Sequence, residues 1–399
     1  MLVKIIDGIK GHKKYFFYGS SILFSRGVEY LILFFAPLML SKQDYGELEF
    51  YKRIIEFSST ILVFGLPTLL VTYSKSYRSK TYLLIFSLVV IISLSMLTIP
   101  FLYYLNYLFL LIPILFYAIF FSNGVLQMYF LVAKGSNTAS LFKIIVSSVF
   151  YSGVFLLIVY SKEPALAFVN SGYFLFPLGL IVMGWLIYSL KPKIKIFFKY
   201  LKLFKKLLIS SSTLVISTIA NMMFMYSDIF IVKILSPNPS IEIANFSFVL
   251  NITNMIILIP MTLVQVDIEK IKKESYDWLQ GYRKKTFIYT SAFSIFIMLG
   301  YFILINTFYE AYKDTMILFL ILFVGKIIQS NSVFLGTQVL IKKYFIENLK
   351  INLITVTFNV IASYLCYLKF GLLGIALVSA LSLAIRYIVL MFYYKKIYR

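Results

Sequence analysis

Charged and amide side chains interrupt long apolar stretches of this sequence, and these are the groups that can handle ions. Arg26 and Glu29 are three positions apart, so they share one face of a helix. Arg53 and Glu56 repeat that spacing in the next apolar stretch. A charge at bilayer depth costs about 2.5–3.5 kcal/mol unless it faces protein or water, so we predict that these groups point inward. The other candidates are Asn221, Asp228, Asn251, Asn254, Lys326 and Arg386.

The cations in this set predict a net-positive, water-filled cavity. Lys326 is central in its apolar stretch and has no acidic neighbour at helical spacing. Such a cavity suits an anion, because fixed Lys and Arg offset the cost of taking its charge out of water. Glu29, Glu56 and Asp228 are available to bind a coupling ion. We therefore expect no cofactor other than H⁺ or Na⁺, with the membrane potential as an additional driving force.

Each candidate also has a structural explanation that the sequence leaves open. Arg26 and Glu29 could neutralise each other within one helix. Arg53 could lie among the outer lipid headgroups, and Arg386 could reach the inner ones. Asp228 could hold helices together by hydrogen bonds. The same explanation applies to Asn221, Asn251 and Asn254.

Composition shows which elements must position these residues. Of the 399 residues, 61% are hydrophobic and 14% charged, against about 45–50% and 25% in soluble chains. The apolar runs are continuous and long enough for helices that cross a bilayer, which need about 20 residues each. We predict an all-α integral membrane protein with twelve transmembrane helices. The predicted spans are Tyr15–Leu40, Gly46–Ser74, Thr81–Tyr103, Leu108–Val132, Ala139–Tyr160, Ala165–Leu190, Leu207–Leu235, Glu242–Val266, Phe287–Thr307, Thr315–Leu340, Ile351–Leu368 and Leu372–Tyr394.

The distribution of basic residues predicts the orientation. The formal net charge is +22, and most of the 38 lysines and arginines fall on one side of the predicted spans. Loops rich in Lys and Arg stay in the cytoplasm, so both termini are predicted to be cytoplasmic. Lys134 and Lys143 count among these inner residues. The positive charge is thus a topology signal and does not indicate nucleic-acid binding.

The chain is predicted to consist of two similar halves around a central cavity. Leu40-Ser41 and Glu47 after the first span are echoed by Leu235-Ser236 and Glu242 after the seventh. Repeated halves with a binding site between them are typical of transporters. The expected domains are an N-terminal six-helix bundle, a basic cytoplasmic linker and a C-terminal six-helix bundle. These domains span residues 1–190, 191–206 and 207–399.

The sequence gives no support for an enzyme. Cys366 and His12 are the only cysteine and histidine, so no Cys/His metal cluster can form. No Walker A motif indicates ATP use. The predicted outer loops are only a few residues long, which disfavours a membrane-embedded glycan polymerase. That activity is kept as a lower alternative.

One short segment resembles a known family. The stretch Asp44-Tyr45-Gly46, continuing to Gly65-Leu66-Pro67, resembles the first two helices of Wzx-type O-antigen flippases, and twelve spans in a 6+6 layout extend the resemblance. These flippases belong to the multidrug/oligosaccharidyl-lipid/polysaccharide exporter superfamily. The resemblance implies alternating access that carries an undecaprenyl-diphosphate-linked oligosaccharide from the cytoplasmic to the periplasmic leaflet of a bacterial inner membrane.

The resemblance also implies roles for individual residues. Related lipid flippases hold the diphosphate with arginines on the first two helices, which correspond by position to Arg26 and Arg53. Lys326 and Arg386 are further candidates for diphosphate binding. Besides membrane lipids, an O-antigen polymerase and a chain-length regulator are candidate partners, and a monomer is expected. The main alternative is a drug or small-molecule cation antiporter of the same superfamily.

Overall fold

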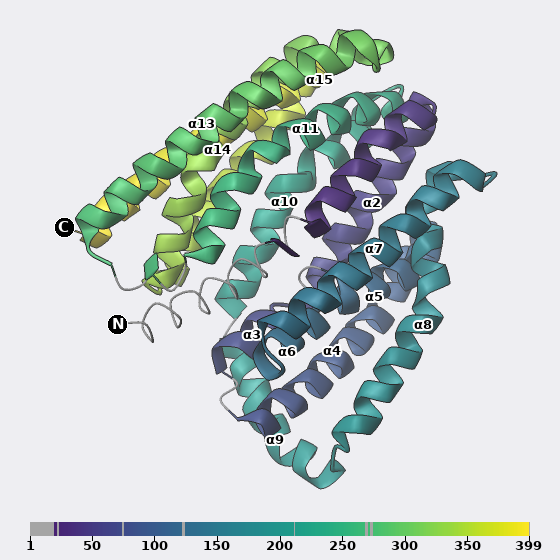
Figure 1. Ribbon diagram of the computed structural model, residues 1–399, viewed down its shortest axis with the longest axis vertical. Coiled ribbons are helices and arrows are strands. Elements are labelled where there is room, and N and C mark those ends of the chain that lie inside the picture. Colours follow the sequence, from purple (N-terminus) through teal and green to yellow (C-terminus); the bar gives the residue numbers. More distant parts are fainter. Residues whose placement is uncertain are drawn as a thin grey trace, which may run out of the picture. The chain divides into compact units, whose positions relative to one another are not determined.

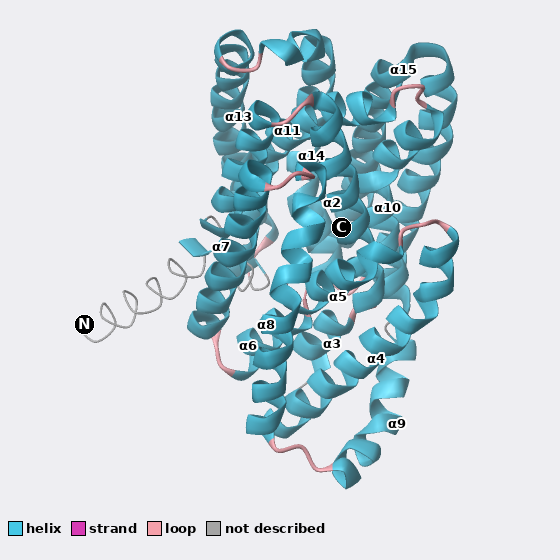
Figure 2. Ribbon diagram, turned by 90° about the vertical axis from the view of Figure 1, so that its right-hand side faces the viewer, coloured by secondary structure: helices cyan, strands magenta, loops and turns pink. Residues whose placement is uncertain are grey.

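The computed structural model describes residues 20–21, 24–73, 76–121, 124–210, 212–267, 270–271 and 274–398. Within these residues the chain is helical and contains no strand (Figure 2). Residues 24–39 form a first helix. The predicted basic tail with His12, and positions 15–19 of the first predicted span, lie outside the described residues.

The helices labelled in Figure 1 are α2 (Lys42–Val63), α3 (Leu66–Tyr73), α4 (Tyr77–Tyr104), α5 (Leu111–Phe120), α6 (Val125–Ala133), α7 (Ser136–Tyr160), α8 (Ala167–Leu190), α9 (Ile194–Ser210), α10 (Ser212–Leu235), α11 (Pro239–Val266), α13 (Tyr276–Thr307), α14 (Met316–Ile341) and α15 (Phe345–Tyr398).

The chain is a multi-pass membrane protein. In its described part, nine helices are long and apolar enough to cross a bilayer. Large apolar side chains such as Leu97 and Trp185 expose 75% and 70% of their surface, which suits lipid rather than water. α2 is not among the nine, because residues 49–56 carry four charges. The total of twelve spans and the cytoplasmic placement of both termini stay predictions.

The last of the nine helices contains two of the predicted spans. The side chains of Ser382 and Asn359 are joined by a 2.9 Å hydrogen bond, although a straight helix would separate them by about 35 Å. The chain turns back at Gly371, where φ is 58° and ψ is −141°. Residues with a side chain rarely adopt this conformation. α15 is therefore a hairpin of two helices, as the predicted break between Leu368 and Leu372 requires.

Contacts divide the chain into two units. The first comprises residues 1–32 and 51–215, and the second comprises 33–50 and 216–399. α2 begins in the second unit and ends in the first. The segment 191–206, predicted as a linker, falls in the first unit and lies mostly in helix α9.

The first unit is packed around aromatic rings. The ring of Phe150 in α7 lies 5.9 Å from Phe116 of α5 and 4.9 Å from Phe168 of α8, measured between centroids. Helix α9 attaches to α4 by stacking of Tyr200 on Tyr82, at 5.6 Å. These contacts hold α4, α5, α7, α8 and α9 together (Figure 1). They form the frame behind the charged residues of this unit.

The second unit has a hydrophobic core cluster and a set of buried polar side chains. Leu279, Leu335, Val339 and Ile351 are all buried in one cluster that joins α13, α14 and α15. Buried polar side chains of the same unit include Asp228 of α10 and Asn359 and Ser363 of α15.

The short Asp44-Tyr45-Gly46 signature marks a close contact inside the second unit. A Cβ atom at Gly46 would lie 1.7 Å from the backbone oxygen of Ser240 in α11. Tyr45 is fully buried, and its hydroxyl accepts a hydrogen bond of 3.3 Å from the amide of Asn251. Only a glycine allows the two helix backbones to approach so closely.

The echoed serines also have matching environments. The Ser41 hydroxyl accepts a hydrogen bond of 3.1 Å from the backbone N–H of Asp44 at the start of α2. The Ser236 hydroxyl accepts one of 3.0 Å from the backbone N–H of Asn238, directly before α11. Each serine therefore satisfies a backbone donor where a helix begins.

Replacing Gly46 by alanine should destabilise the protein by about 1–3 kcal/mol, because the added methyl group forces α2 away from α11. The measurement is the thermal unfolding midpoint of the purified protein in detergent. Gly300 is the matched control, since a Cβ atom there meets nothing within 4 Å. Gly300→Ala should leave the midpoint unchanged or raise it, and an equal midpoint for Gly46→Ala would refute the packing explanation.

Candidate functional site

A cluster of ion pairs occupies the first unit. The Arg26 guanidinium lies 2.6 Å from a Glu29 carboxylate oxygen, and the other oxygen lies 4.0 Å from the ammonium of Lys52 in α2. Lys52 exposes only 1% of its surface and Glu29 only 9%. Glu29 thus stands between two cations from two helices. The predicted pairing of Arg26 with Glu29 is present, but the pair has a further cationic neighbour.

The second predicted pair lies farther along α2. Arg53 and Glu56 are 3.3 Å apart and both are buried. The Tyr117 hydroxyl of α5 donates a 3.3 Å hydrogen bond to Glu56. The face of α2 with Lys52, Arg53 and Glu56 therefore packs against protein within this unit.

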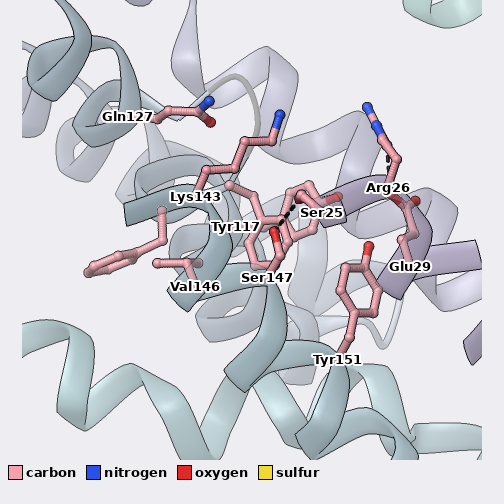
Figure 3. Close-up of a pocket in the computed structure, with 11 residues that line it drawn as sticks. Ser25, Arg26, Glu29, Tyr117, Gln127, Lys143, Val146, Ser147 and Tyr151 are labelled. Carbon is pink, nitrogen blue, oxygen red and sulfur yellow. Dashed lines mark hydrogen bonds and ion pairs between the residues drawn. The ribbon is translucent and has the colours of Figure 1, made fainter. Parts of the chain in front are cut away.

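A pocket opens beside the first ion pair. Arg26 and Glu29 form one wall, and Lys143, Ser147 and Tyr151 of α7 form another (Figure 3). The α7 residues recur every four positions, so they share one helix face. The remaining lining comes from Ser25, Tyr117, Phe120, Phe121, Gln127 and Val146.

The pocket is held in shape by a short contact across it. The hydroxyl groups of Ser25 and Ser147 are 2.6 Å apart and buried, so they join the first helix to α7. In Figure 3 the cationic ends of Lys143 and Arg26 point to the same side of the pocket, with Gln127 beside Lys143. The pocket therefore presents cations and neutral hydrogen-bond donors together.

Cations outnumber carboxylates in this region. Among the described residues of the first unit, four cations, Arg26, Lys52, Arg53 and Lys143, lie near Glu29 and Glu56, whereas Glu49, one turn earlier on α2, belongs to the second unit. Glu49 is fully buried and accepts a 3.1 Å hydrogen bond from Asn251. A surplus of fixed positive charge in a low-dielectric region attracts an anion.

Sequence reasoning missed Lys143, Lys52 and Tyr117 as parts of this site. Lys143 was predicted to be one of many inner basic residues, whereas it lies in the pocket wall about two turns into α7. The repeat Lys143, Ser147, Tyr151 was the available signal, because four-residue spacing of polar groups marks one helix face. Tyr117 had no such signal, since it stands in an apolar segment.

The second unit contains a different arrangement, centred on Asp228 of α10. Its carboxylate accepts hydrogen bonds from Asn359 at 3.0 Å and Ser363 at 3.4 Å, and also from Ser379. Asn359 donates to Ser227 as well, at 3.0 Å. Asp228 is therefore buried between α10 and both arms of α15.

This arrangement fits the predicted hydrogen bonding between helices, and it also offers oxygen ligands to a small cation. Asp228 supplies one negative charge, and Ser363 and Ser379 supply hydroxyl oxygens. Carboxylate and hydroxyl oxygens are hard ligands that suit H⁺ or a monovalent cation. No cluster of three His, Cys, Asp or Glu side chains exists among the described residues, so nothing in that part of the chain resembles a transition-metal site.

The other predicted residues of the second unit lie in its interior. Lys326 is buried, donates a 3.0 Å hydrogen bond to Gln329, and is near enough to Asp228 to interact electrostatically. The Arg386 guanidinium lies 5.9 Å from the centre of the Phe224 ring. Asn221 and Asn254 are half-buried.

The structure thus places the predicted residues in two groups. Arg26, Glu29, Arg53 and Glu56 belong to the first unit. The second unit holds Asn221, Asp228, Asn251, Asn254, Lys326 and Arg386. That both groups face one central cavity stays a prediction.

Removing the Asn359 amide should destabilise the second unit, because Asp228 would lose a donor in a buried site. We expect Asn359→Ala to cost about 1–3 kcal/mol. The measurement is the thermal unfolding midpoint in detergent. Asn306→Ala is the control, because Asn306 is exposed and bonds only within α13. Equal midpoints for both variants would contradict the central role of Asn359.

Comparison with known proteins identifies the relatives of this architecture. The sequence profile of the family described as "Polysaccharide biosynthesis protein" matches residues 12–268, more than half of the chain. No curated protein matches the sequence.

Several solved structures share the fold. The lipid II flippase MurJ in an inward closed conformation has a TM-score of 0.62 at 16% identity, covering 95% of this chain and 87% of its own. An inward-facing multidrug resistance MATE family transporter of the MOP superfamily has a TM-score of 0.63 at 12% identity, covering 92% and 94%. The MATE multidrug transporter DinF-BH has a TM-score of 0.60 at 13% identity, covering 96% and 95%. These likenesses establish a shared transporter fold, and the matched structures are transporters and flippases rather than enzymes.

Proposed function

Because this chain belongs to the family of polysaccharide biosynthesis proteins, we propose that it carries lipid-linked oligosaccharides across a membrane. The proposed substrate is an undecaprenyl-diphosphate-linked O-antigen repeat unit. It would move from the cytoplasmic to the periplasmic leaflet of a bacterial inner membrane. The observation that supports this most is the surplus of cations around the pocket of the first unit, where Arg26 and Lys143 stand together.

The substrate class follows from charge. A diphosphate brings about two negative charges, and taking such a group into hydrocarbon without partners costs tens of kcal/mol by simple solvation arguments. Arginine offsets this cost well, because its planar guanidinium can bind phosphate oxygens in pairs. We propose that Arg26 and Arg53 bind the diphosphate from the first unit and that Lys326 and Arg386 bind it from the second during alternating access.

Transport in one direction needs an energy source. A group of charge about −2 that leaves a negative interior gains roughly 4–5 kcal/mol per 100 mV of membrane potential. We propose that Asp228 binds H⁺ or Na⁺ to reset the empty carrier, with Glu29 and Glu56 as further candidates. The hydroxyl groups of Ser363 and Ser379 beside Asp228 support this role, because their oxygens would serve as neutral ligands to a bound cation. Asn221, Asn251 and Asn254 would line the polar path.

Reversing the charge of the proposed diphosphate ligands should stop export. We expect Arg26→Glu and Lys326→Glu each to lower surface O-antigen at least about tenfold, because an attraction becomes a repulsion. Lipid-linked repeat units should then accumulate in the cytoplasmic leaflet, as measured by leaflet-selective labelling. Lys369→Glu is the control, since Lys369 is exposed beside the turn of α15.

The same strains test the main alternative, a drug or small-molecule cation antiporter. This alternative has support from the MATE transporter structures, which resemble the chain as strongly as the flippase does. Unchanged O-antigen in both charge-reversed strains, together with increased drug susceptibility in a deletion strain, would favour the antiporter and reject the flippase.

Neutralising Asp228 should uncouple transport from its ion. Asp228→Asn keeps the shape of the side chain and removes its charge, so we expect a folded protein whose transport no longer responds to an imposed H⁺ or Na⁺ gradient. The measurement is lipid translocation in proteoliposomes under each gradient. Asp277→Asn is the control, because Asp277 is an exposed residue in the first turn of α13. A normal gradient response in Asp228→Asn would exclude Asp228 as the coupling site.

A further inference from the structure

The pocket of the first unit contains a second cation besides Arg26, which is Lys143 of α7. Among the described residues, Lys143 has neither a hydrogen bond nor an ion pair, although it is only partly exposed. It does interact electrostatically with Arg26 and Glu29. Lysines near helix ends commonly extend to the lipid headgroups. Lys143 instead lines the pocket, where its ammonium points to the same side as the Arg26 guanidinium (Figure 3).

Arg26 differs from Lys143 because it already has an anionic partner. Glu29 lies 2.6 Å from Arg26, and it lies 4.0 Å from Lys52 on its other side. A phosphate group that approaches Arg26 must therefore compete with Glu29. If Arg26 turns to a phosphate, Glu29 remains next to Lys52 and is not left as an isolated buried charge.

Neutral donors complete the surroundings of these two cations. Tyr151 and Ser147 follow Lys143 along the same face of α7, and Gln127 of α6 stands beside Lys143 (Figure 3). Hydroxyl and amide groups can donate to the oxygens that the cations leave uncovered. Two cations and several donors around one pocket match a phosphate group better than they match a cationic drug.

We propose that Lys143 and Arg26 form a two-cation phosphate subsite in which Glu29 occupies the place of the phosphate until substrate arrives. Lys143 makes the first contact, and Arg26 then exchanges Glu29 for a phosphate oxygen. Lys52 holds Glu29 during the exchange. This inference rests on the proposed function and adds to it a binding residue on α7 and an order of events.

The role of Glu29 explains why a binding site for an anion should contain a carboxylate. Without Glu29, the positive charges of Arg26 and Lys52 would repel each other when no substrate is bound, and bound phosphate would be released slowly. With Glu29 present, the empty pocket has a compensated arginine, and the carboxylate competes for it when the substrate leaves. Tight binding and rapid release are opposing requirements, and the carboxylate balances them.

Direct binding measurements test this proposal. The probe is farnesyl diphosphate, added to the full-length protein in phosphatidylcholine nanodiscs. We expect Lys143→Gln to weaken binding at least about tenfold, equivalent to about 1.4 kcal/mol, while Lys143→Arg stays within about threefold of the unaltered chain. Lys134→Gln is the matched control, because Lys134 lies near the Tyr77 ring and outside the pocket. Glu29→Gln should bind the probe more tightly, because the competing charge is gone.

Two comparisons identify the group that is recognised. Inorganic pyrophosphate should compete with the probe, whereas farnesol should not. Nanodiscs containing phosphatidylglycerol should leave the affinity nearly unchanged, and strong competition by that lipid would show that the pocket binds ordinary anionic headgroups, which would overturn the proposal.

Failure of this proposal can be distinguished from failure of the proposed function. If Arg26→Gln abolishes binding but Lys143→Gln binds normally, the flippase function stands and the role of Lys143 is refuted. If the unaltered chain does not bind farnesyl diphosphate, both are refuted. If Glu29→Gln binds more weakly than the unaltered chain, the place-holding role of Glu29 is wrong. Thermal unfolding midpoints of all variants exclude loss of folding as the cause.

Discussion

The cost of keeping charge inside an apolar protein governs the organisation of this chain. Each buried cation needs a carboxylate, an aromatic ring or a polar acceptor within a few ångströms, because water is not available to solvate it. Arg26, Lys52 and Arg53 satisfy this need through Glu29 and Glu56. These compensations determine which helix faces turn toward each other, and the aromatic packing behind them keeps those faces in place.

The carboxylates near the pocket of the first unit do not balance all of the positive charge there. We propose that the remaining positive charge allows the pocket to attract an anion. A site in which every charge had its partner would be a structural element with no attraction for a substrate. Among the described residues that line the pocket of the first unit, Arg26 and Lys143 stand beside the single carboxylate of Glu29, and we propose that an added anion completes the balance. The second unit differs, because its buried carboxylate, Asp228, accepts hydrogen bonds from neutral side chains. We propose that the pocket of the first unit binds an anion and that Asp228 of the second unit binds a small cation.

The same fold occurs in proteins that carry different cargo. The chain resembles lipid flippases and drug transporters to the same degree, so the arrangement of helices does not select the substrate. Selection belongs to the side chains on the inner faces of those helices. In this chain the pocket of the first unit has Arg26 and Lys143 beside Glu29, which supports the proposal of an anionic cargo.

Much of this could be predicted without coordinates. The helical, membrane-embedded class followed from long apolar runs, because lipid allows only structures that satisfy their own backbone groups. The pairs Arg26–Glu29 and Arg53–Glu56 were predictable from their three-residue spacing, since local helix geometry alone brings them together. The turn at Gly371 lies where the predicted spans break.

Contacts between distant residues required the tertiary structure. Lys52 meets Glu29, Tyr117 meets Glu56, and Asn359 meets Asp228 across separations of 23, 61 and 131 residues. Sequence spacing carries no information about such pairs, because they depend on how helices rotate and pack. The Asp44-Tyr45-Gly46 signature was visible as a pattern, but the approach of the Ser240 backbone that requires its glycine was not. The amino-acid order thus determined which charges enter the apolar region and which pairs form within one helix. The tertiary structure decided which partners these charges meet on other helices. Only packing brings separate helices within the few ångströms over which charges compensate each other.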